Sequence, residues 1–456
     1  MKRLALLFLA ACNLTPKYER PVAPVPAQFA DAGTPKGSAS AMPVVNFVQE
    51  PKLQKVVALA LDQSRDLRKS VLAITAARAQ YRIQKAQLYP SIDATLAVQA
   101  GRAVYDLGGQ TGVATSETYS AEVGVSNWEI DLFGRLRSLT EAQRQQFLAT
   151  VETAKATRIS LVAETAQAWV ALAADKSRMG IAKDTMTSAK RTMDLTEALV
   201  VGGTENRSDY WQADTLFQAA RADVATLQAQ IAQDKNALDL LCGAAVPEDL
   251  LPDALPDALD WFGDVPAGLE SSVLLERPDV LAAEHQLMAA NANIGAARAQ
   301  YFPRITLTGA TGIASTALAA LFDGPSWVWS LVPSLAQPIF HGGAIKANVE
   351  YSKAQKAIMV ATYEQAIQSA FRDVADALAT RATITEQLDA QKAQVEVATK
   401  AFELAQARYK AGVDTFLNSL VAERALYTAK NALAATQQAA LANRVQLYRV
   451  LGGGTQ

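Results

Sequence analysis

The chain has 456 residues, a formal net charge of −2, 50% hydrophobic residues and 19% charged residues. It has no long run of Lys or Arg, which argues against nucleic acid as a partner, because neutralising phosphates requires clustered positive charge. Two histidines and two cysteines are too few for a His/Cys metal cluster of ordinary spacing, and Walker, HExxH and GxSxG motifs are absent from the sequence. We therefore expect no enzyme, no metal and no cofactor.

The N-terminus has the pattern of a short secretory signal. Lys2 and Arg3 are followed by an apolar run, residues 4–11, and then by Cys12. The sequence LAAC resembles a bacterial lipobox, so we expect residues 1–11 to be a signal peptide and Cys12 to carry covalent lipid. A chance Cys beside a weak signal is the alternative. No later apolar stretch reaches the ~20 residues of a spanning helix, so the mature chain is either held by lipid alone or crosses a membrane as strands.

The first half of the chain predicts a leader, a helix and two strands. Residues 12–47 are rich in Pro and Ala and predict an extended leader. A helix from about residue 48 is expected to end at Tyr89, because Pro90 disfavours the helical conformation of the residue before it. Residues 91–106 and 118–134 contain alternating apolar residues and predict strands, which the Gly/Thr/Ser-rich residues 107–117 join as a loop.

A long uninterrupted helix is predicted next. Residues 135–201 contain no Pro and a single Gly, so they predict one helix that Gly203 ends. A return helix over about 208–241 leads to Gly243 and completes a first repeat, residues 48–243. A Pro-rich linker, residues 244–268, follows.

The second half repeats this order over residues 269–456. We expect a helix over 269–302, two strands, a Gly- and Pro-free helix over 344–411, a turn at Gly412 and a last helix to Leu451. Equivalent landmarks recur at nearly constant separations, as expected after a tandem duplication. They are Pro90 and Pro303, Phe133 and Phe340, Gly203 and Gly412, and Gly243 and Gly452.

The four predicted strands are each about as long as a strand that crosses a bilayer, ~9–11 residues. Lipid tolerates no open sheet edge, so four strands must be pooled with those of other copies, and three copies would supply twelve. Trp128, Trp327 and Trp329 near strand ends favour a membrane interface. Soluble hairpins that flank a coiled coil remain the alternative, because a buried Trp in a soluble sheet gives the same pattern.

Several motifs together resemble the TolC-like outer-membrane factor family, in the lipoprotein branch that serves resistance-nodulation-division multidrug pumps. They are CNLTPKYERP, the twice-written AQ-aromatic-Pro turn, WEIDLFGRLRS, PIFHGG and ARYKAGVDTFLNSLVAERALYTAKNAL. The resemblance runs from Cys12 to Gly452. It implies an α+β membrane protein of the bacterial outer membrane: a homotrimer whose twelve-stranded β-barrel, four strands per protomer, continues into a long α-helical barrel across the periplasm. It also implies passive export of small molecules, with a periplasmic adaptor and an inner-membrane pump as partners.

The resemblance assigns roles to individual residues. Asp131 is expected to cap the first long helix, and Gly134 to ease the bend between strand and helix. Gly203 and Gly412 match the helix–helix turns at the periplasmic tip, where Arg408 and Tyr409 tie the tip shut or pack at a helix end.

The helices beyond those turns line the aperture in this family. The usual acidic positions are occupied by Asn418 and Val421, so this chain departs from the commonest pattern. Asp209 and Asp414 supply carboxylates nearby, and three copies of either residue form a ring that favours cations. Solvated turns are the alternative role for both residues.

Two other functions compete with the exit duct. A periplasmic coiled-coil adaptor, or a structural lipoprotein, would contain long helices, but adaptors carry a Gly-rich β module that is absent here. A lipoprotein enzyme would need a convergent catalytic group, and the sequence offers none.

Overall fold

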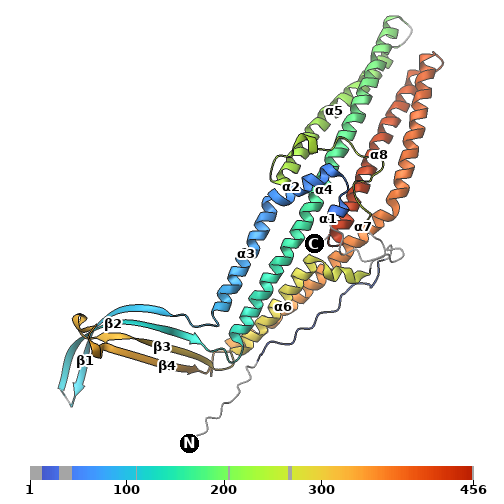
Figure 1. The fold of residues 1–456 in the computed structure, drawn as a ribbon. Coiled ribbons are helices and arrows are strands. Elements are labelled where there is room, and N and C mark those ends of the chain that lie inside the picture. The colour runs from blue at the N-terminus through green and yellow to red at the C-terminus, as the bar shows by residue number, and fades with distance from the viewer. Residues whose placement is uncertain (1–12, 30–43, 109, 204–205, 265–269, 454–456) are drawn as a thin grey trace. The chain divides into compact units, whose positions relative to one another are not determined.

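The computed structural model describes residues 13–29, 44–108, 110–203, 206–264 and 270–453 (Figure 1). The chain divides into two compact units. The sheet unit comprises Met1–Val22, Ala73–Val151 and Ala282–Glu364, and the helix-hairpin unit comprises Ala23–Leu72, Glu152–Leu281 and Gln365–Gln456.

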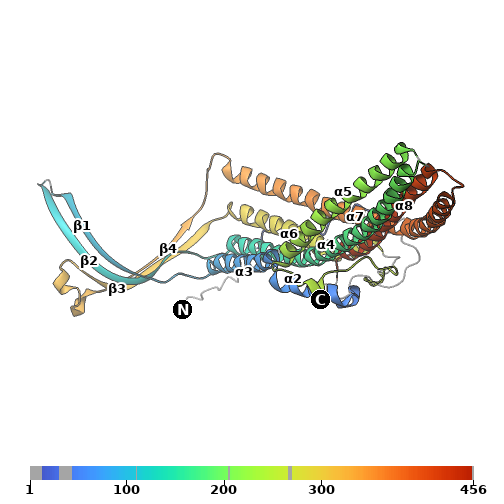
Figure 2. The same cartoon turned by 90° about the horizontal axis from the view of Figure 1, so that it is seen from above.

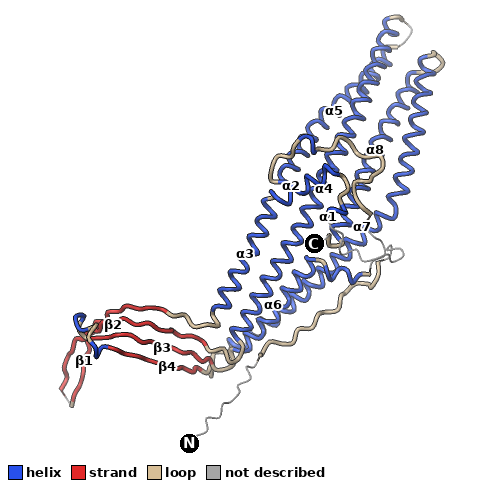
Figure 3. The backbone as a smooth tube through the Cα atoms, in the orientation of Figure 1, coloured by secondary structure: helices blue, strands red, loops and turns tan. Residues whose placement is uncertain are grey.

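The two predicted hairpins form one antiparallel sheet with the strand order β1-β2-β3-β4 (Figures 1 and 3). Its strands are β1 (Asp93–Leu107), β2 (Gln110–Glu129), β3 (Arg304–Ser315) and β4 (Trp327–Ala336). Strand β2 pairs with β3, which joins the two repeats, and β1 and β4 form the outer edges. Among the described residues, each edge strand is therefore paired on one side.

The loop predicted over residues 107–117 is wrong. The β1–β2 ladder continues to the pair Leu107 and Gln110, so the strands are 15 and 20 residues long and extend beyond β3, as Figure 2 shows. Gly108 has a φ of +64°, as a tight two-residue hairpin turn requires. The Thr and Val residues of this stretch favour strand, and they outweigh the Gly and Ser that indicated a loop.

The two long helices lie where their sequences predict them. Helix α4 spans Arg135–Val201 and α7 spans Ala344–Lys410, 67 residues each. Return helices follow both of them, α5 (Arg207–Cys242) and α8 (Phe416–Val450). Short 3₁₀ helices complete the connections: Glu248–Leu250, Ser271–Glu276, Leu318–Ala320 and Gly324–Ser326.

Two predicted helices are wrong in extent. The helix predicted over residues 48–89 divides into α2 (Pro51–Gln63) and α3 (Arg65–Ala86), because the buried Ser64 adopts a ψ of 128°. The short helix α1 (Val44–Phe47) precedes it, at the end of the segment that was expected to be an extended leader. The helix predicted from residue 269 starts as α6 (Pro278–Ala299), because a Pro disfavours the helical conformation of the residue before it.

The helix-hairpin unit has an aromatic core. Phe47 stacks on Phe262, with 5.1 Å between ring centroids, and on Tyr448, with 4.1 Å. Trp169 meets Trp261 edge to face and donates its indole N–H to the carbonyl of Leu250. Residues of the predicted Pro-rich linker, 244–268, are therefore part of this core.

The described part of the leader is docked rather than free. In the sheet unit, Arg20 makes a bidentate ion pair with the buried carboxylate of Glu284, with both N–O distances 2.7 Å, and Tyr18 donates to the same carboxylate. Asn291 donates to the carbonyl of Pro16. These bonds hold the leader along α6.

Candidate functional site

The register of the sheet sorts its side chains onto two faces. Val98 pairs with Tyr119, Ala121 with Ile313, and Ile313 with Trp327, so these residues share one face. We call this the apolar face. It includes Ala94, Leu96, Val98, Tyr119, Ala121, Val123, Trp128, Ile305, Leu307, Ile313, Trp327, Trp329, Leu331 and Leu335.

The opposite face carries mostly small and polar residues. It includes Thr95, Ala97, Gln99, Ser120, Glu122, Gly124, Glu129, Arg304, Thr306, Thr308, Ala310, Gly312, Ser330 and Ser334. Val328 and Val332 also lie on this second face, so the alternation in β4 is not strict. Alternation of apolar and polar residues is the pattern of a membrane-spanning strand that faces lipid on one side and water on the other.

The apolar face is exposed in the protomer. Leu96 is 85% exposed and Trp329 65%, values that a soluble sheet would bury against a second layer. From Ile305 to Ile313 this face runs for about 26 Å at ~3.3 Å per residue. Trp128 lies near one end of this band and Trp327 near the other, in the positions that membrane interfaces favour.

Charged residues lie at the junction where the strands end and the helices begin. Glu129 accepts two hydrogen bonds from Arg135, at 2.8 and 2.7 Å, and forms an ion pair with Arg304 at 2.7 Å. Hydrogen bonding to Glu129 is the main cause that raises the pKa of Arg135. The pairing keeps the Glu129 carboxylate compensated although it is nearly buried.

Asp131 lies four residues before α4, and Gly134, with a φ of +76°, directly precedes the helix. One Asp131 carboxylate oxygen nevertheless accepts the backbone N–H of Arg137 at 2.8 Å, which is the bond expected of a capping residue. Arg137 Nε donates to the same oxygen at 3.2 Å. The expected capping chemistry is thus present, but Asp131 does not occupy the N-cap position itself.

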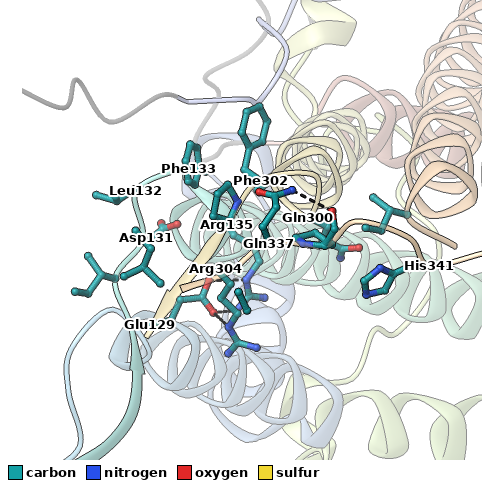
Figure 4. A pocket seen from close by; sticks show the side chains of 17 residues that line it. Glu129, Asp131, Leu132, Phe133, Arg135, Gln300, Phe302, Arg304, Gln337 and His341 are labelled. Carbon is teal, nitrogen blue, oxygen red and sulfur yellow. Dashed lines mark hydrogen bonds and ion pairs between the residues drawn. The ribbon is translucent and has the colours of Figure 1, made fainter. Parts of the chain in front are cut away.

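A cavity of about 460 Å³ lies at this junction within the sheet unit (Figure 4). The ring of Phe133, from the β2–α4 connection, stacks on that of Phe302, from the α6–β3 connection, with 4.8 Å between ring centroids. Gln337 and His341, which follow β4, line another side of the cavity. Its walls therefore come from three chain connections, and Figure 4 shows these side chains around it.

The turn between α4 and α5 contains two of the predicted tip residues. Gly203 has a φ of +75°, the left-handed conformation that favours Gly at the end of a helix. Asp209 is the third residue of α5, where a carboxylate stabilises the positive end of the helix. Its side chain has no hydrogen bond or ion pair with any described residue.

The turn between α7 and α8 brings three predicted residues together. Asp414 accepts from Asn418 Nδ2 at 2.5 Å, from the backbone N–H of Thr415 at 2.9 Å and from Arg408 Nε at 3.2 Å. These hydrogen bonds, with that from Asn418 the largest, lower the pKa of Asp414. Gly412, with a φ of +68°, makes the turn that places them together.

Tyr409 points into the helix-hairpin unit rather than into solvent. It is buried, its ring meets Phe416 edge to face with 5.6 Å between centroids, and its hydroxyl lies 3.5 Å from Thr196 Oγ1. Ala213 and Leu216 of α5 belong to the same buried cluster. Tyr409 thus links the two helix hairpins by packing.

Sequence reasoning missed two polar groups in the helix-hairpin unit. Glu423 is 5% exposed, burial raises its pKa, and its Oε1 atom has no hydrogen-bond partner among the described residues. The sequence signal that indicates its burial is its place between the apolar residues Leu420 and Leu426 of α8. The second group is Arg277, which donates to the carbonyl of Val450 at 2.6 Å and makes a bidentate pair with Asp279.

In the part of the chain that the structure describes, no group of three or more His, Cys, Asp or Glu residues is arranged to hold a metal ion. None of the described helices combines the length and hydrophobicity needed to cross a membrane. Cys12 lies outside the described residues, and Cys242 is a buried free thiol.

Comparisons with known proteins agree on one family. The family described as "Outer membrane efflux protein" matches residues 56–244 and 269–453. The toluene efflux pump outer membrane protein TtgI of Pseudomonas putida is 41% identical over 99% of this chain and 97% of its own length. Outer membrane protein OprJ of Pseudomonas aeruginosa is 39% identical over 99% of this chain and 95% of its own length.

Solved structures give the same result. The open state of the MtrE outer membrane channel of Neisseria gonorrhoeae matches with a TM-score of 0.88 and 36% identity, covering 98% of this chain and 99% of that one. The outer-membrane channel OprN matches with a TM-score of 0.87 and 29% identity, covering 97% and 100%.

These matches confirm the predicted resemblance, the TolC-like α+β fold class and the function of a transport duct. They favour neither an adaptor nor a lipoprotein enzyme. Both family matches contain one helix–strand–strand–helix–helix set, in agreement with the duplicated order of elements. The chain belongs to the outer membrane efflux protein family and is a non-enzymatic exit duct for small molecules in the outer membrane.

Proposed function

We propose that this protein works as a homotrimer in a tripartite efflux system, docked to a periplasmic adaptor and an inner-membrane pump, and anchored by lipid on Cys12. The observation that carries the proposal is a four-stranded sheet with an exposed apolar face and two open edges, β1 and β4. Lipid offers no partner for an open edge, so the sheet requires further copies to close. Three copies supply twelve strands, within the range of known outer-membrane barrels.

The lining of such a barrel supports passive conduction. The face opposite the apolar face carries mostly small and polar residues. Its charged residues include Asp93, Glu122, Glu129 and Arg304, and its apolar ones include Val328 and Val332. A lining of this kind holds water and offers no large apolar pocket. Relatives are named for the efflux of toluene, solvents and antibiotics, and we propose hydrophobic small molecules as cargo here. Energy for export then comes from the inner-membrane pump.

The two helix turns are the proposed periplasmic aperture. Asp414 is bound by Arg408 and Asn418, so its charge is largely compensated, whereas Asp209 has no partner among the described residues. In a trimer, Asp209 then supplies the ring of three carboxylates that favours cations, and Asp414 with Arg408 shapes the turn. Tyr409 packs between the hairpins and holds the two turns in one arrangement.

The docked leader supports a lipid anchor at Cys12. Arg298 Nη1 donates to the carbonyl of Leu14 at 3.2 Å, and Thr15 Oγ1 lies 3.0 Å from Ser138 Oγ. A Cβ on Gly295 would lie 2.1 Å from Thr15 Oγ1, so this close approach requires Gly. These contacts hold the start of the described leader beside the last turn of α6, six residues before β3 begins. The described leader therefore begins close to the end of the sheet, which supports a lipid anchor just before it.

Native mass spectrometry of protein extracted from membranes tests the assembly and the lipid together. We expect a trimer whose protomers carry the mass of residues 12–456 plus diacylglycerol and an amide-linked acyl chain. The Cys12→Ser variant should keep the uncleaved signal and carry no lipid. A lone water-soluble protomer would contradict the proposal of an exit duct, and an unlipidated wild-type trimer would contradict the anchor alone.

Export is tested in a strain that lacks other exit ducts but expresses a matching adaptor and pump. Deleting the gene should increase sensitivity to toluene and hydrophobic antibiotics, and a plasmid copy should restore resistance. Unchanged sensitivity in that strain would contradict the assigned cargo.

A further inference from the structure

The strand–helix junctions of the two repeats contain equivalent aromatic residues. The sequence AQLYP, residues 86–90, recurs as AQYFP, residues 299–303, which makes Tyr89 the equivalent of Phe302. Phe133 and Phe340 both lie in the segment that leads from a strand into a long helix. Each repeat therefore supplies one aromatic residue before its first strand and one after its second.

Within the protomer, one such pair is in contact. Phe133 stacks on Phe302, with 4.8 Å between the ring centroids and 18° between the ring planes. The contact exists because β2 and β3 are neighbours: Phe133 lies four residues after Glu129, and Phe302 lies four residues before Thr306, its partner in the ladder. The stack therefore lies where the second strand of the first repeat pairs with the first strand of the second repeat.

The two equivalent residues are left without this contact. Tyr89 precedes β1 and Phe340 follows β4, and these strands are the opposite edges of the sheet. Tyr89 is 65% exposed and Phe340 86% exposed. Each has a further exposed apolar residue close by, Ile92 and Ile339 respectively. Two apolar patches thus lie at the ends of the two unpaired edges.

We propose that Phe340 of one protomer stacks on Tyr89 of the partner subunit, so that the junction between subunits copies the junction inside the protomer. The inference rests on the proposed homotrimer, in which β4 pairs with β1 of the partner subunit. By the same correspondence between the repeats, Ala336 is the equivalent of Glu129 and Asp93 is the equivalent of Thr306. A subunit junction that copies the Glu129–Thr306 pair therefore places Ala336 opposite Asp93 of the partner subunit. The neighbouring pair, Leu335 and Ala94 of the partner subunit, then brings two apolar faces together, as a continuous lipid-facing surface requires.

Cross-linking tests the contact in the full-length protein. Tyr89→Cys and Phe340→Cys are combined in one chain and treated in membranes with a short bis-methanethiosulfonate reagent. We expect covalent dimers and trimers in denaturing gels. Phe322, an equally exposed Phe in the β3–β4 connection, is the matched control. Tyr89→Cys with Phe322→Cys should give no cross-linked species, because that connection lies at the other end of the strands.

The outcomes separate the inference from the proposed function. Native mass spectrometry of the uncross-linked protein reports the oligomeric state independently. A trimer with inter-subunit cross-links supports the stack. A trimer in which residues 89 and 340 do not cross-link, or cross-link within one chain, overturns the inference and leaves the exit duct intact. A protein that forms no trimer overturns the proposed function itself.

A double-mutant cycle then tests whether the two rings interact. Phe340→Ala and Tyr89→Ala should each weaken the trimer, and their coupling should amount to about 2- to 10-fold in the trimer dissociation constant. Phe133→Ala with Tyr89→Ala is the control pair, and its effects should be additive. Additive effects for residues 89 and 340 would overturn the stack.

Discussion

The sheet and the helix-hairpin unit bury their apolar residues in different ways. The helix-hairpin unit encloses Phe47, Trp169, Phe262 and Tyr448 within the protomer, and Trp169 is 1% exposed. The sheet instead leaves a row of large apolar side chains exposed, from Leu96 to Trp329. The helix-hairpin unit therefore encloses an aromatic core, whereas the sheet presents its large apolar side chains outward, where lipid can cover them.

Charged residues are also placed differently in the helix-hairpin unit and in the sheet. The helix-hairpin unit tolerates buried polar groups such as Arg277, which is paired with Asp279. The apolar face has no charged residue between Ala94 and Ala100 on β1 or between Trp327 and Leu335 on β4. Stability of the helix-hairpin unit is therefore a property of the chain, whereas stability of the sheet depends on the membrane around it.

The largest expected effect is in the helix-hairpin core. Trp169→Ala should destabilise this unit by about 3–5 kcal/mol, because it leaves a large cavity and removes a hydrogen bond to Leu250. The loss should be the same in detergent and in vesicles, measured by thermal unfolding. Trp211→Ala, at an exposed site, should change stability by about 0.5 kcal/mol or less. Equal losses for both variants would contradict a self-contained core.

A charge on the sheet should act in the membrane alone. Leu331→Arg places a charge on the apolar face and should cost about 2–4 kcal/mol of folding free energy in vesicles. Ser330→Arg, one residue away on the opposite face, is the matched control and should cost far less. Reversible unfolding in urea with vesicles measures both. If the two variants lost equal stability, the assignment of the faces would be wrong.

The buried Glu423 should make the stability of the helix-hairpin unit depend on pH. Burial raises its pKa above the ordinary value of 4.5, so the folded state binds the proton more tightly than the unfolded state. The wild type should therefore lose stability relative to Glu423→Gln as pH rises from 4.5 through the raised pKa, and match it best in acid. Melting temperatures of both proteins across pH 4–8 test this. A gap that widens toward acid would contradict it.

The smallest effect on stability is expected at the α7–α8 turn. Arg408→Gln removes the largely exposed cation beside the half-buried Asp414 and should leave the melting temperature nearly unchanged. In planar bilayers, the same change should increase the preference for K⁺ over Cl⁻, measured as a shift in reversal potential. Lys410→Gln, which removes a nearby charge that contacts Gln406, is the control. An equal shift in both variants would show that Arg408 has no special place at the aperture.

Much of the architecture could be predicted from local rules. Residues 135–201 form one helix because no Pro or second Gly interrupts them, and the strands alternate because one side faces lipid. The break at Ser64 could not be predicted, because its extended conformation depends on tertiary burial rather than on a local signal. Residues 107–117 contain both Gly and Ser, which favour a loop, and β-branched residues, which favour strand, so local composition alone does not determine their conformation.

The candidate site was predicted less completely. The Gly residues of the turns carry a local signal, and Asp131 accepts the predicted kind of bond from a position further from the helix. Arg408, Asp414 and Asn418 were singled out separately, and the structure brings them together around one carboxylate. Contacts between side chains that are four to six residues apart depend on the conformation of the turn, and sequence spacing alone does not determine that conformation.

A cysteine scan along β4 tests directly whether one face of the sheet meets lipid and the other face meets water. Single cysteines from Trp327 to Ala336 are labelled in vesicles with a lipid-soluble and a water-soluble maleimide. Cys242 stays silent because burial raises its pKa to about 11. We predict strict alternation, with residues 327, 329, 331 and 335 labelled from lipid and residues 328, 330, 332 and 334 from water. Equal labelling of both sets by the water-soluble reagent would contradict a sheet that lines a membrane duct.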